Sequence, residues 1–225
     1  GQAASNMLDL VQASGILPEG QMGEQIFEGQ NQLVEQFAEK LQPHYPEVFL
    51  TAAPFELKLN DFVLTGQLEQ LHQGGLFHYR MAKAKGHDLL NLWINHLILN
   101  ATKPEGVALH SELLTEDKEY QLTPVDNAEA LLQQLVDLYW QGMQQALPFF
   151  SNTSYAFAKT TLNKTTASPE TAMLAAWQGG QYASAEVDDA YYQQLYQDSP
   201  LTESFKELAL EVFEPIQAHL EGGEL

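Results

Sequence analysis

The chain has 225 residues, of which 44% are hydrophobic and 10% aromatic, and these values are typical of a folded globular protein rather than a disordered tail. Its 30 acidic residues against 10 Lys and Arg give a formal net charge of −20, which repels phosphate and argues against a free-standing nucleic-acid binder. The absence of Cys excludes a disulfide framework and thiolate metal sites.

No apolar run is long enough for a membrane span, and the first residues lack the basic end and apolar core of a signal peptide. We therefore expect a cytoplasmic protein that makes no membrane contact. Because the chain begins at Gly1, inside a Gln-rich and helical-looking stretch, we also expect it to be a fragment of a longer protein.

The first half of the chain shows the pattern of an α/β core. An apolar stripe at helical spacing predicts a helix over residues 23–41. Period-two alternation then predicts two strands joined by Asn60 and Asp61, and a third strand follows the glycine pair Gly74-Gly75. A helix with many apolar positions comes next, and two further strands turn back at residues 116–118. The expected strands cover residues 54–59, 62–71, 76–82, 107–113 and 120–122. The helix between the third and fourth of them is expected to start at Gly86-His87-Asp88 and to run to about Ala101.

The second half, beyond Pro124, shows helical patterns. Ser168 and Pro169 have the residue types of an N-cap and a first helical position, and Asp126 or Asn127 suits the N-cap of the first of these helices. The expected helices cover residues 126–146, 154–162, 168–177, 188–196 and 202–220. We expect the core over residues 1–123 and the helical layer over residues 124–225 to form one domain, because the connection between them is short.

The positive charge of the chain is concentrated in one short segment. Arg80 is the only Arg, and Lys83 and Lys85 follow it closely, whereas residues 165–225 hold eleven acids and only Lys206. Any phosphate contact is therefore expected from residues 80–85. The alternative is that these side chains form ion pairs within the protein or with a partner.

The order helix, three strands, helix, strand is similar to the core of the PD-(D/E)XK nuclease fold. The segment LTGQLEQLHQGGLFHYRMAKA at 64–84 looks like the strand pair of RecB-type nucleases. Four segments together resemble the family of C-terminal domains of RecC, the gamma subunit of exonuclease V. They are ILPEGQMGEQIFE at 16–28, the stretch from LTGQLEQL to LLNLWINHL at 64–97, LLQQLVDLYWQGMQQALPFF at 131–150, and AAWQGGQ with EVDDAYYQQL at 175–195.

This resemblance implies a nuclease-like domain that has lost cleavage. In RecB-type enzymes a His follows a Gly in the first helix, a Gly-x-x-Asp lies on the second strand, and an acid-x-Lys lies on the third. Here Gly66 to Glu69 match the second element, no His follows Gly23, and Tyr79, Arg80, Met81 and Ala82 occupy the third place without a carboxylate. We therefore expect no catalytic residues and no metal site, only a degenerate site at Glu69, Tyr79 and Met81, because one acid alone is a poor ligand set for Mg²⁺.

The resemblance further implies assembly with RecB-type and RecD-type subunits, contact with DNA only in the full complex, and no cofactor. The DNA-contact candidates are Arg80, Lys83 and Lys85. Two other functions stay open at this point. One is an active Mg²⁺-dependent PD-(D/E)XK exonuclease, and the other is a protein-interaction domain without DNA contact.

Three other groups of residues suggest structural roles. The seven His lack the helix spacing of a zinc motif and are expected as surface or capping residues. The aromatic residues Tyr139, Trp140, Phe149, Phe150, Tyr155 and Phe157 are expected in the core or in a buried partner interface, because few cations accompany them. Glu186, Asp188 and Asp189 are expected to stabilise the start of the helix that follows them.

Overall fold

The protein is described from a computed structural model, which covers residues 10–11, 13–18, 20–180 and 185–225. The chain divides into two compact units, Gly1–Tyr45 and Pro46–Leu225. The first unit contains helix α2 (Gln21–Leu41), which begins two residues before the expected helix. This helix is amphipathic as predicted, although Ile26 and Leu33 on its apolar face remain partly exposed.

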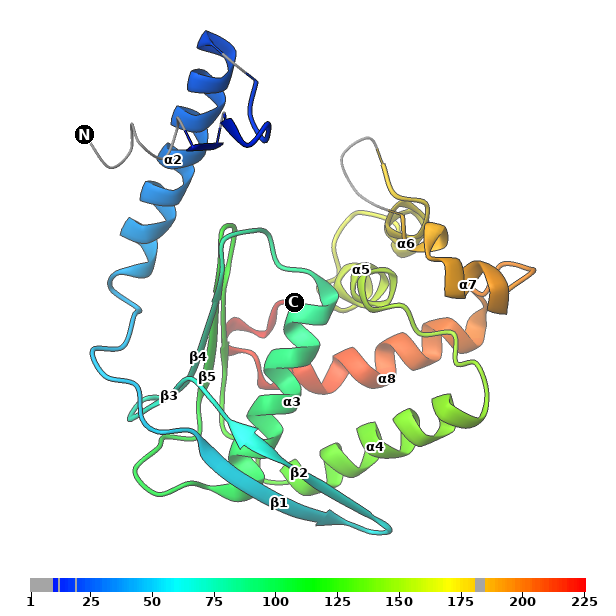
Figure 1. Cartoon of the computed structure of the whole chain (residues 1–225). Coiled ribbons are helices and arrows are strands. Elements are labelled where there is room, and N and C mark those ends of the chain that lie inside the picture. The colour runs from blue at the N-terminus through cyan, green and yellow to red at the C-terminus, as the bar shows by residue number, and fades with distance from the viewer. Residues whose placement is uncertain (1–9, 12, 19, 181–184) are drawn as a thin grey trace. The chain divides into compact units, whose positions relative to one another are not determined.

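The second unit is a mixed α/β structure with two small sheets, as expected from the sequence (Figure 1). The first sheet is the hairpin of β1 (Ala53–Leu59) and β2 (Phe62–Leu68). The second sheet has the order β3-β4-β5-β6, and β4 runs parallel to β5 while the other pairs are antiparallel. Its strands are β3 (Leu71–His72), β4 (Gly75–Arg80), β5 (Ser111–Thr115) and β6 (Glu119–Leu122).

The strand expected at residues 62–71 is wrong as one element, because the chain bends between β2 and β3. Gln70 has a left-handed φ of 56°, which a continuous strand does not tolerate. As a result β2 pairs with β1, whereas β3 pairs with β4. The next expected strand, at 107–113, is shifted to β5, because residues 103–110 form turns that place Val107 against Pro104.

Helix α3 (Gly86–Thr102) connects the parallel strands β4 and β5 and supplies much of the core. Gly86 has to be glycine, because a Cβ there would lie 1.9 Å from the carbonyl oxygen of Ser151. Gly75 is under a similar restriction, since its φ is 131° and a Cβ there would lie 2.1 Å from the carbonyl oxygen of His110. The glycines of the resemblance therefore have a role in the fold.

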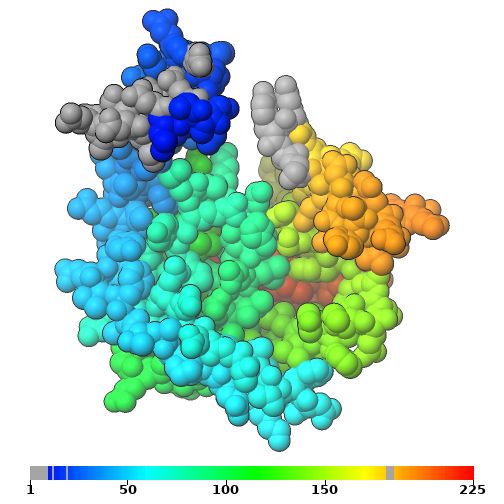
Figure 2. Space-filling view, in the orientation of Figure 1, coloured from blue at the N-terminus to red at the C-terminus, as the bar shows by residue number. Residues whose placement is uncertain are grey.

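The helical layer packs on α3 and the sheet (Figure 1). It consists of α4 (Ala128–Gln144), α5 (Ser151–Leu162), α6 (Pro169–Gln178), the 3-10 turn η1 (Glu186–Asp188), α7 (Ala190–Leu195), α8 (Glu203–His219) and the 3-10 turn η2 (Glu221–Gly223). Figure 2 shows part of α8, in red, in a recess between the segments around it.

The main core joins the two layers. Its fully buried side chains include Leu68, Leu76, Leu89, Trp93, Leu97, Phe213, Ile216 and Leu225. A second cluster lies inside the helical layer around Phe150, whose ring contacts those of Trp177, Tyr192, Tyr196 and Phe205. Among the described helices, none has both the length and the apolarity needed to cross a bilayer.

Candidate functional site

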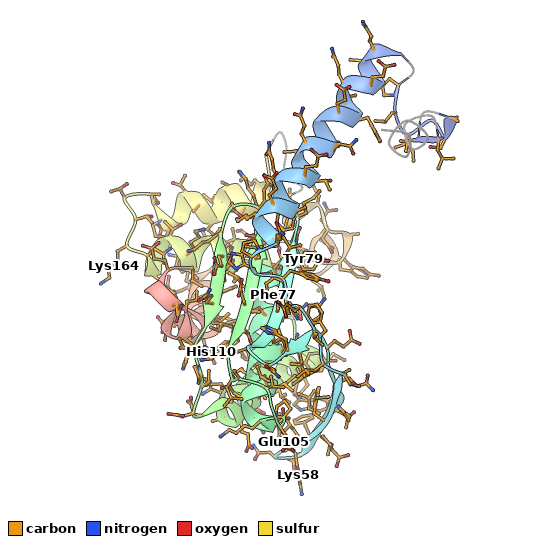
Figure 3. The ribbon with its side chains drawn as sticks, turned by 90° about the vertical axis from the view of Figure 1, so that its left-hand side faces the viewer. Lys58, Phe77, Tyr79, Glu105, His110 and Lys164 are labelled. Atoms are coloured by element: carbon orange, nitrogen blue, oxygen red, sulfur yellow. The ribbon has the colours of Figure 1, made fainter. Side chains whose placement is uncertain are left out.

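The end of β4 and the turn that follows it contain the residues that the resemblance to nucleases predicts for the third element. Tyr79 on β4 and Met81 after it are about half exposed, at 47% and 46%. Figure 3 shows Tyr79 on β4 together with Phe77, and their rings lie 6.2 Å apart. The side chains at this place are thus a phenol and a thioether, neither of which replaces a carboxylate as a ligand for Mg²⁺.

The carboxylate of Asp88 lies at this turn, and several donors occupy it. Arg80 Nη1 lies 2.6 Å from both of its oxygens. The backbone N–H of Lys85 donates to Asp88 Oδ2 at 2.8 Å, so that the same carboxylate closes the first turn of α3. The His87 imidazole contacts Arg80 Nη1 at 2.9 Å. Asp88 is therefore a structural group that neutralises Arg80 and begins the helix.

Glu69 lies in the bend between β2 and β3, with its side chain exposed. The neighbouring Gln70 carbonyl accepts a hydrogen bond from Phe77 N–H at 3.1 Å, which keeps the bend beside β4. Asp88, at the start of α3, is bonded to Arg80 and is not available to share a cation with Glu69. This donor set does not fit a two-carboxylate magnesium site.

The segment from Met81 to Lys85 is held at several points. Glu116 N–H donates to the Ala82 carbonyl at 3.1 Å, and Ala84 N–H donates to Asp117 Oδ1 at 3.2 Å. Burial acts to raise the pKa of Asp117, but the hydrogen bonds from Ala84 and Thr115 outweigh it and hold the pKa below its ordinary value. The exposed Lys83 and Lys85 side chains therefore extend from a fixed segment.

The three predicted phosphate contacts do not remain equivalent in this geometry. Arg80 is half-buried in its ion pair with Asp88, and its side chain is 29% exposed. Lys83 and Lys85 are exposed, and the described structure shows no ion pair that involves either of their ammonium groups. Two of the three cations are thus available to a ligand.

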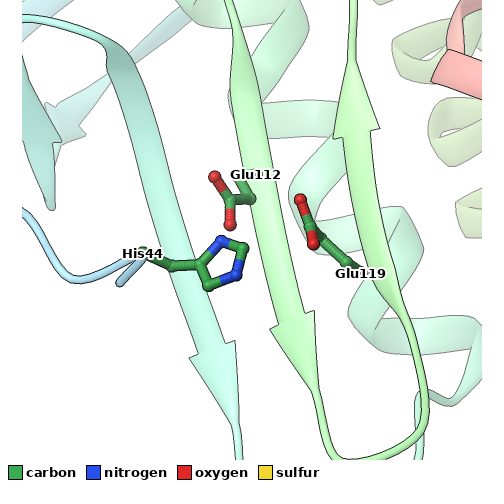
Figure 4. Close-up of side chains that lie close together, drawn as sticks. All are labelled: His44, Glu112 and Glu119. Atoms are coloured by element: carbon green, nitrogen blue, oxygen red, sulfur yellow. The ribbon is translucent and has the colours of Figure 1, made fainter. Parts of the chain in front are cut away.

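A second pair of carboxylates was missed by the sequence reasoning. Glu112 of β5 and Glu119 of β6 lie next to each other on one face of the sheet (Figure 4). His44, which the figure also draws, belongs to the first unit. Among the described residues of the second unit, no third His, Asp or Glu comes within ligand distance of this pair. Two exposed or half-exposed acids alone do not make a metal site.

His96 corrects the expectation that every His is a surface or capping residue. It is completely buried, with Ser111 Oγ at 2.8 Å from Nδ1 and the Thr123 carbonyl oxygen at 2.9 Å from Nε2. The carbonyl requires a proton on Nε2, so Nδ1 accepts the hydrogen bond from Ser111. Desolvation by burial lowers the pKa of His96 to about 4, which keeps the ring neutral.

The Ser111–His96–Thr123 arrangement has the order of a nucleophile, a base and an orienting group. Ser111 is only 2% exposed, however, and a base with a pKa of about 4 accepts a proton poorly at neutral pH. Asn100 on the same helix donates to the His96 carbonyl and accepts from Val125 N–H, both at 2.9 Å. We call this group of His96, Asn100, Ser111 and the Thr123 carbonyl the His96 cluster. Its hydrogen bonds join the α/β core to the helical layer.

The predicted acidic group at 186–189 has two separate roles. Asp189 accepts hydrogen bonds from Tyr191 N–H and Tyr192 N–H and caps α7, as expected. The expectation for Glu186 is wrong, because its carboxylate reaches α5 instead. There it accepts from Asn152 N–H at 3.0 Å, Thr153 N–H at 2.8 Å and Thr153 Oγ1 at 2.6 Å.

The predicted aromatic group also divides. Phe150, Tyr155 and Phe157 are buried, in agreement with the core expectation. Tyr139 and Trp140 on α4 are 68% and 50% exposed. For these two residues the core alternative is wrong, because they lie in the C-terminal part of α4, where residues 139–144 are all exposed. The alternative of a partner interface stays a prediction.

Comparison with known proteins gives a family match and two relatives. The family model described as "RecC C-terminal domain" matches residues 2–162. The chain is 28% identical over 210 residues to the "RecBCD enzyme subunit RecC" of Escherichia coli (strain K12), covering 86% of this chain and 18% of that protein. It is 22% identical over 222 residues to the protein of the same name from Buchnera aphidicola subsp. Schizaphis graminum (strain Sg), covering 92% of this chain and 20% of that protein. The chain therefore spans about a fifth of the length of the curated relatives that it matches.

Proposed function

We propose, from the premise that this chain belongs to the RecC C-terminal domain family, that it is a non-catalytic, nuclease-like domain in the RecC subunit of a RecBCD-type helicase-nuclease. In this role the domain serves subunit assembly and the handling of DNA strands during double-strand break repair by homologous recombination. Cleavage and ATP hydrolysis belong to RecB-type and RecD-type partner subunits. The core up to residue 123 and the helical layer after it act together, and neither needs a cofactor.

The observation that carries the non-catalytic part is the bonding of Asp88. The turn after β4 is where a nuclease of this outline needs a free carboxylate beside the acid of the preceding strand. Residues 79–82 provide no carboxylate there, and the nearby Asp88 is bonded to Arg80 and to the first turn of α3, while Glu69 stands exposed in the bend. Recruiting Asp88 to a cation would break the Arg80 ion pair and uncap α3.

Cleavage of linear DNA in the presence of Mg²⁺ or Mn²⁺ tests this part. The purified chain and its Glu69→Ala variant are expected to show the same background rate at every metal concentration. Metal-dependent cleavage that the Glu69→Ala substitution abolishes would instead establish an active nuclease.

The DNA-handling part is proposed for Lys83 and Lys85. They project from a segment that the hydrogen bonds of Ala82 and Ala84 hold in place, so they offer two positioned ammonium groups on an otherwise acidic surface. Two phosphate contacts give modest affinity alone, because the net charge of −20 opposes DNA binding. The contact is therefore effective where the rest of an assembly already holds the strand.

The test compares two double variants of the full-length subunit in its assembly with the helicase subunits. We expect Lys83→Ala with Lys85→Ala to weaken DNA binding and to reduce the slope of log K against log salt by about 2. The control is Lys58→Ala with Lys164→Ala, which removes two exposed lysines that Figure 3 shows far from Tyr79. Equal slopes and equal unwinding rates for both variants at several salt concentrations would contradict the DNA-contact assignment.

A further inference from the structure

Helix α4 presents three large apolar side chains to the outside of the second unit. Tyr139, Trp140 and Met143 are 68%, 50% and 65% exposed, and we call these three residues the α4 patch. The preceding turns of the same helix are anchored in the main core through Leu132, with Leu135 and Leu138 packed against it. The patch is therefore held on a rigid element.

The α4 patch lies in a neutral zone of a strongly acidic protein. Residues 138–158 contain no Asp, Glu, Lys, Arg or His, although the chain as a whole carries 40 acidic and basic residues and a net charge of −20. The exposed polar neighbours on the same helix end are Gln141 and Gln144. Uncharged aromatic and Met side chains beside amides are the composition found at the centre of protein–protein interfaces.

The rim of the patch is acidic. Asp137 precedes Tyr139 on α4, and Asp61 precedes Phe62, whose ring lies 5.5 Å from that of Trp140. Both carboxylates are exposed, and no ion pair of the described structure engages either. The nearest Lys on the hairpin, Lys58, pairs in register with the outward-facing Val63 rather than with Phe62. A partner that surrounds its apolar contacts with Lys or Arg would gain from this arrangement, and a phosphate surface would be repelled.

The area argues against a second copy of this chain as the occupant. Three side chains of this size at half to two-thirds exposure offer on the order of 350 Å². Two patches face to face would bury roughly 700 Å², which is below the roughly 1,200 Å² of a stable specific interface. Such a dimer would also bring together two chains that each carry a net charge of −20. The patch instead suits the energetic centre of a larger interface with a different protein.

We propose that the α4 patch is a docking site for another subunit of the assembly, one whose contact surface has apolar side chains framed by Lys or Arg. This inference rests on the proposed role in subunit assembly and assigns one face of the domain to it. Trp140 is already supported by Phe62, so little side-chain freedom is lost when a partner covers it.

The experiment measures the affinity of the full-length subunit for its partner subunits by sedimentation velocity or gel filtration across a dilution series. Tyr139→Ser with Met143→Ser removes the apolar centre, and the expected result is an affinity at least tenfold lower. The matched control is Tyr191→Ser with Leu195→Ser on α7, which removes two side chains of comparable exposure, 76% and 59%. The control is expected to assemble like the unsubstituted subunit.

Charge reversal tests the basic frame of the partner. Asp61→Lys with Asp137→Lys is expected to lower the association rate about threefold and to flatten its dependence on salt. Far-UV circular dichroism and thermal unfolding accompany every variant, and unchanged folding is expected because all the substituted side chains are exposed.

A serine double variant that assembles within threefold of the α7 control overturns the inference. So does a variant that loses only self-association of the chain, since the patch then belongs to a second copy. Faster association after charge reversal also overturns it, because the partner surface would then be acidic. If the unsubstituted subunit itself fails to assemble with helicase subunits, it is the proposed function that fails.

A chemical footprint gives an independent readout. Met143→Cys introduces a thiol into a chain that has no Cys, and Leu195→Cys does the same on α7. Maleimide labelling at position 143, followed by mass spectrometry of the peptide, is expected to slow at least tenfold in the assembly, with no change at position 195. Equal labelling of both positions in the free and assembled subunit contradicts docking at the patch.

Discussion

The His96 cluster and the turn between β4 and α3 are both polar groups built on α3, yet the cluster is buried and the turn is exposed to solvent. In the His96 cluster, His96, Ser111 and Asn100 are buried and bonded to one another or to backbone groups. In the turn, Asp88 and Arg80 form a partly exposed pair, while Lys83 and Lys85 point outward. Burial thus separates the polar groups that hold this fold from those that can meet a ligand.

The largest effect is expected from removing the ring of His96, the centre of the His96 cluster. His96→Ala leaves the Ser111 hydroxyl and the Thr123 carbonyl without their hydrogen-bond partner and creates a cavity in the interior. It should lower the free energy of unfolding by about 3 kcal/mol. Urea titration of this variant measures the loss. His110→Ala serves as the control, because His110 is exposed and its removal should change the free energy by less than about 0.5 kcal/mol. Equal urea midpoints for His96→Ala and His110→Ala would contradict the structural role that we assign to the buried His96 cluster.

The His96 cluster should also make the free energy of unfolding depend on pH. The pKa of His96 in the folded chain is about 4, below its ordinary value of 6.5, so the unfolded chain binds an additional proton between these values. The contribution is present above pH 6.5 and is lost as the pH falls toward 4, by up to about 3 kcal/mol.

The pH measurement compares the unsubstituted chain with His96→Gln by urea titration between pH 7 and pH 4. The difference between the two curves isolates His96, because burial also lowers the pKa of His72 and of His78 in both chains. The acid Asp117, with its lowered pKa, loses its contribution only below its ordinary value of 3.8. Parallel curves over this range would show that His96 is not neutral in the folded chain.

A smaller effect is expected at the turn. Asp88→Ala removes the Arg80 ion pair and the acceptor of the Lys85 N–H, and should cost about 1 to 2 kcal/mol in unfolding free energy. It should also free Arg80, so that the salt dependence of DNA binding by the assembly steepens by about 1 in slope. An unchanged slope would mean that Arg80 stays out of reach of the strand.

The smallest effect on stability is expected at the outward lysines. Lys83→Ala with Lys85→Ala should change the unfolding free energy by less than about 0.5 kcal/mol, because the hydrogen bonds of this segment come from its backbone. The same urea titration measures it. A loss of about 2 kcal/mol or more in unfolding free energy would show that these lysines stabilise the fold, as the His96 cluster does, rather than face a ligand.

The sequence predicts the elements whose signals are local. The Ser168-Pro169 start of α6 is confirmed, with the Ser168 hydroxyl accepting from Thr171 N–H at 3.3 Å. The alternation of β1 and β2 and the helical pattern of α3 likewise appear where the residues indicate them. In each case the residue and the group that it satisfies are close in the chain.

What the sequence does not reveal depends on partners far along the chain. Glu186 caps a helix that begins 35 residues before it, so its own neighbours indicate nothing of this contact. His96 lies on an apolar helix face, and only the fold brings Ser111 and Thr123 to its ring. The bonding of Asp88 to Arg80 is likewise set by the direction of β4 relative to α3, which a spacing of eight residues does not define.

The last described residues have a consequence for how the domain reaches its native state. Phe213, Ile216 and Leu225 belong to the same core as Leu89 and Leu97, and Leu220 forms a bridge to Leu122. During synthesis, well over a hundred residues after α3 must therefore be translated before the residues of α8 can cover its apolar face. Such long-range contacts slow folding, and they leave the nascent sheet open to chaperones until translation has passed α8.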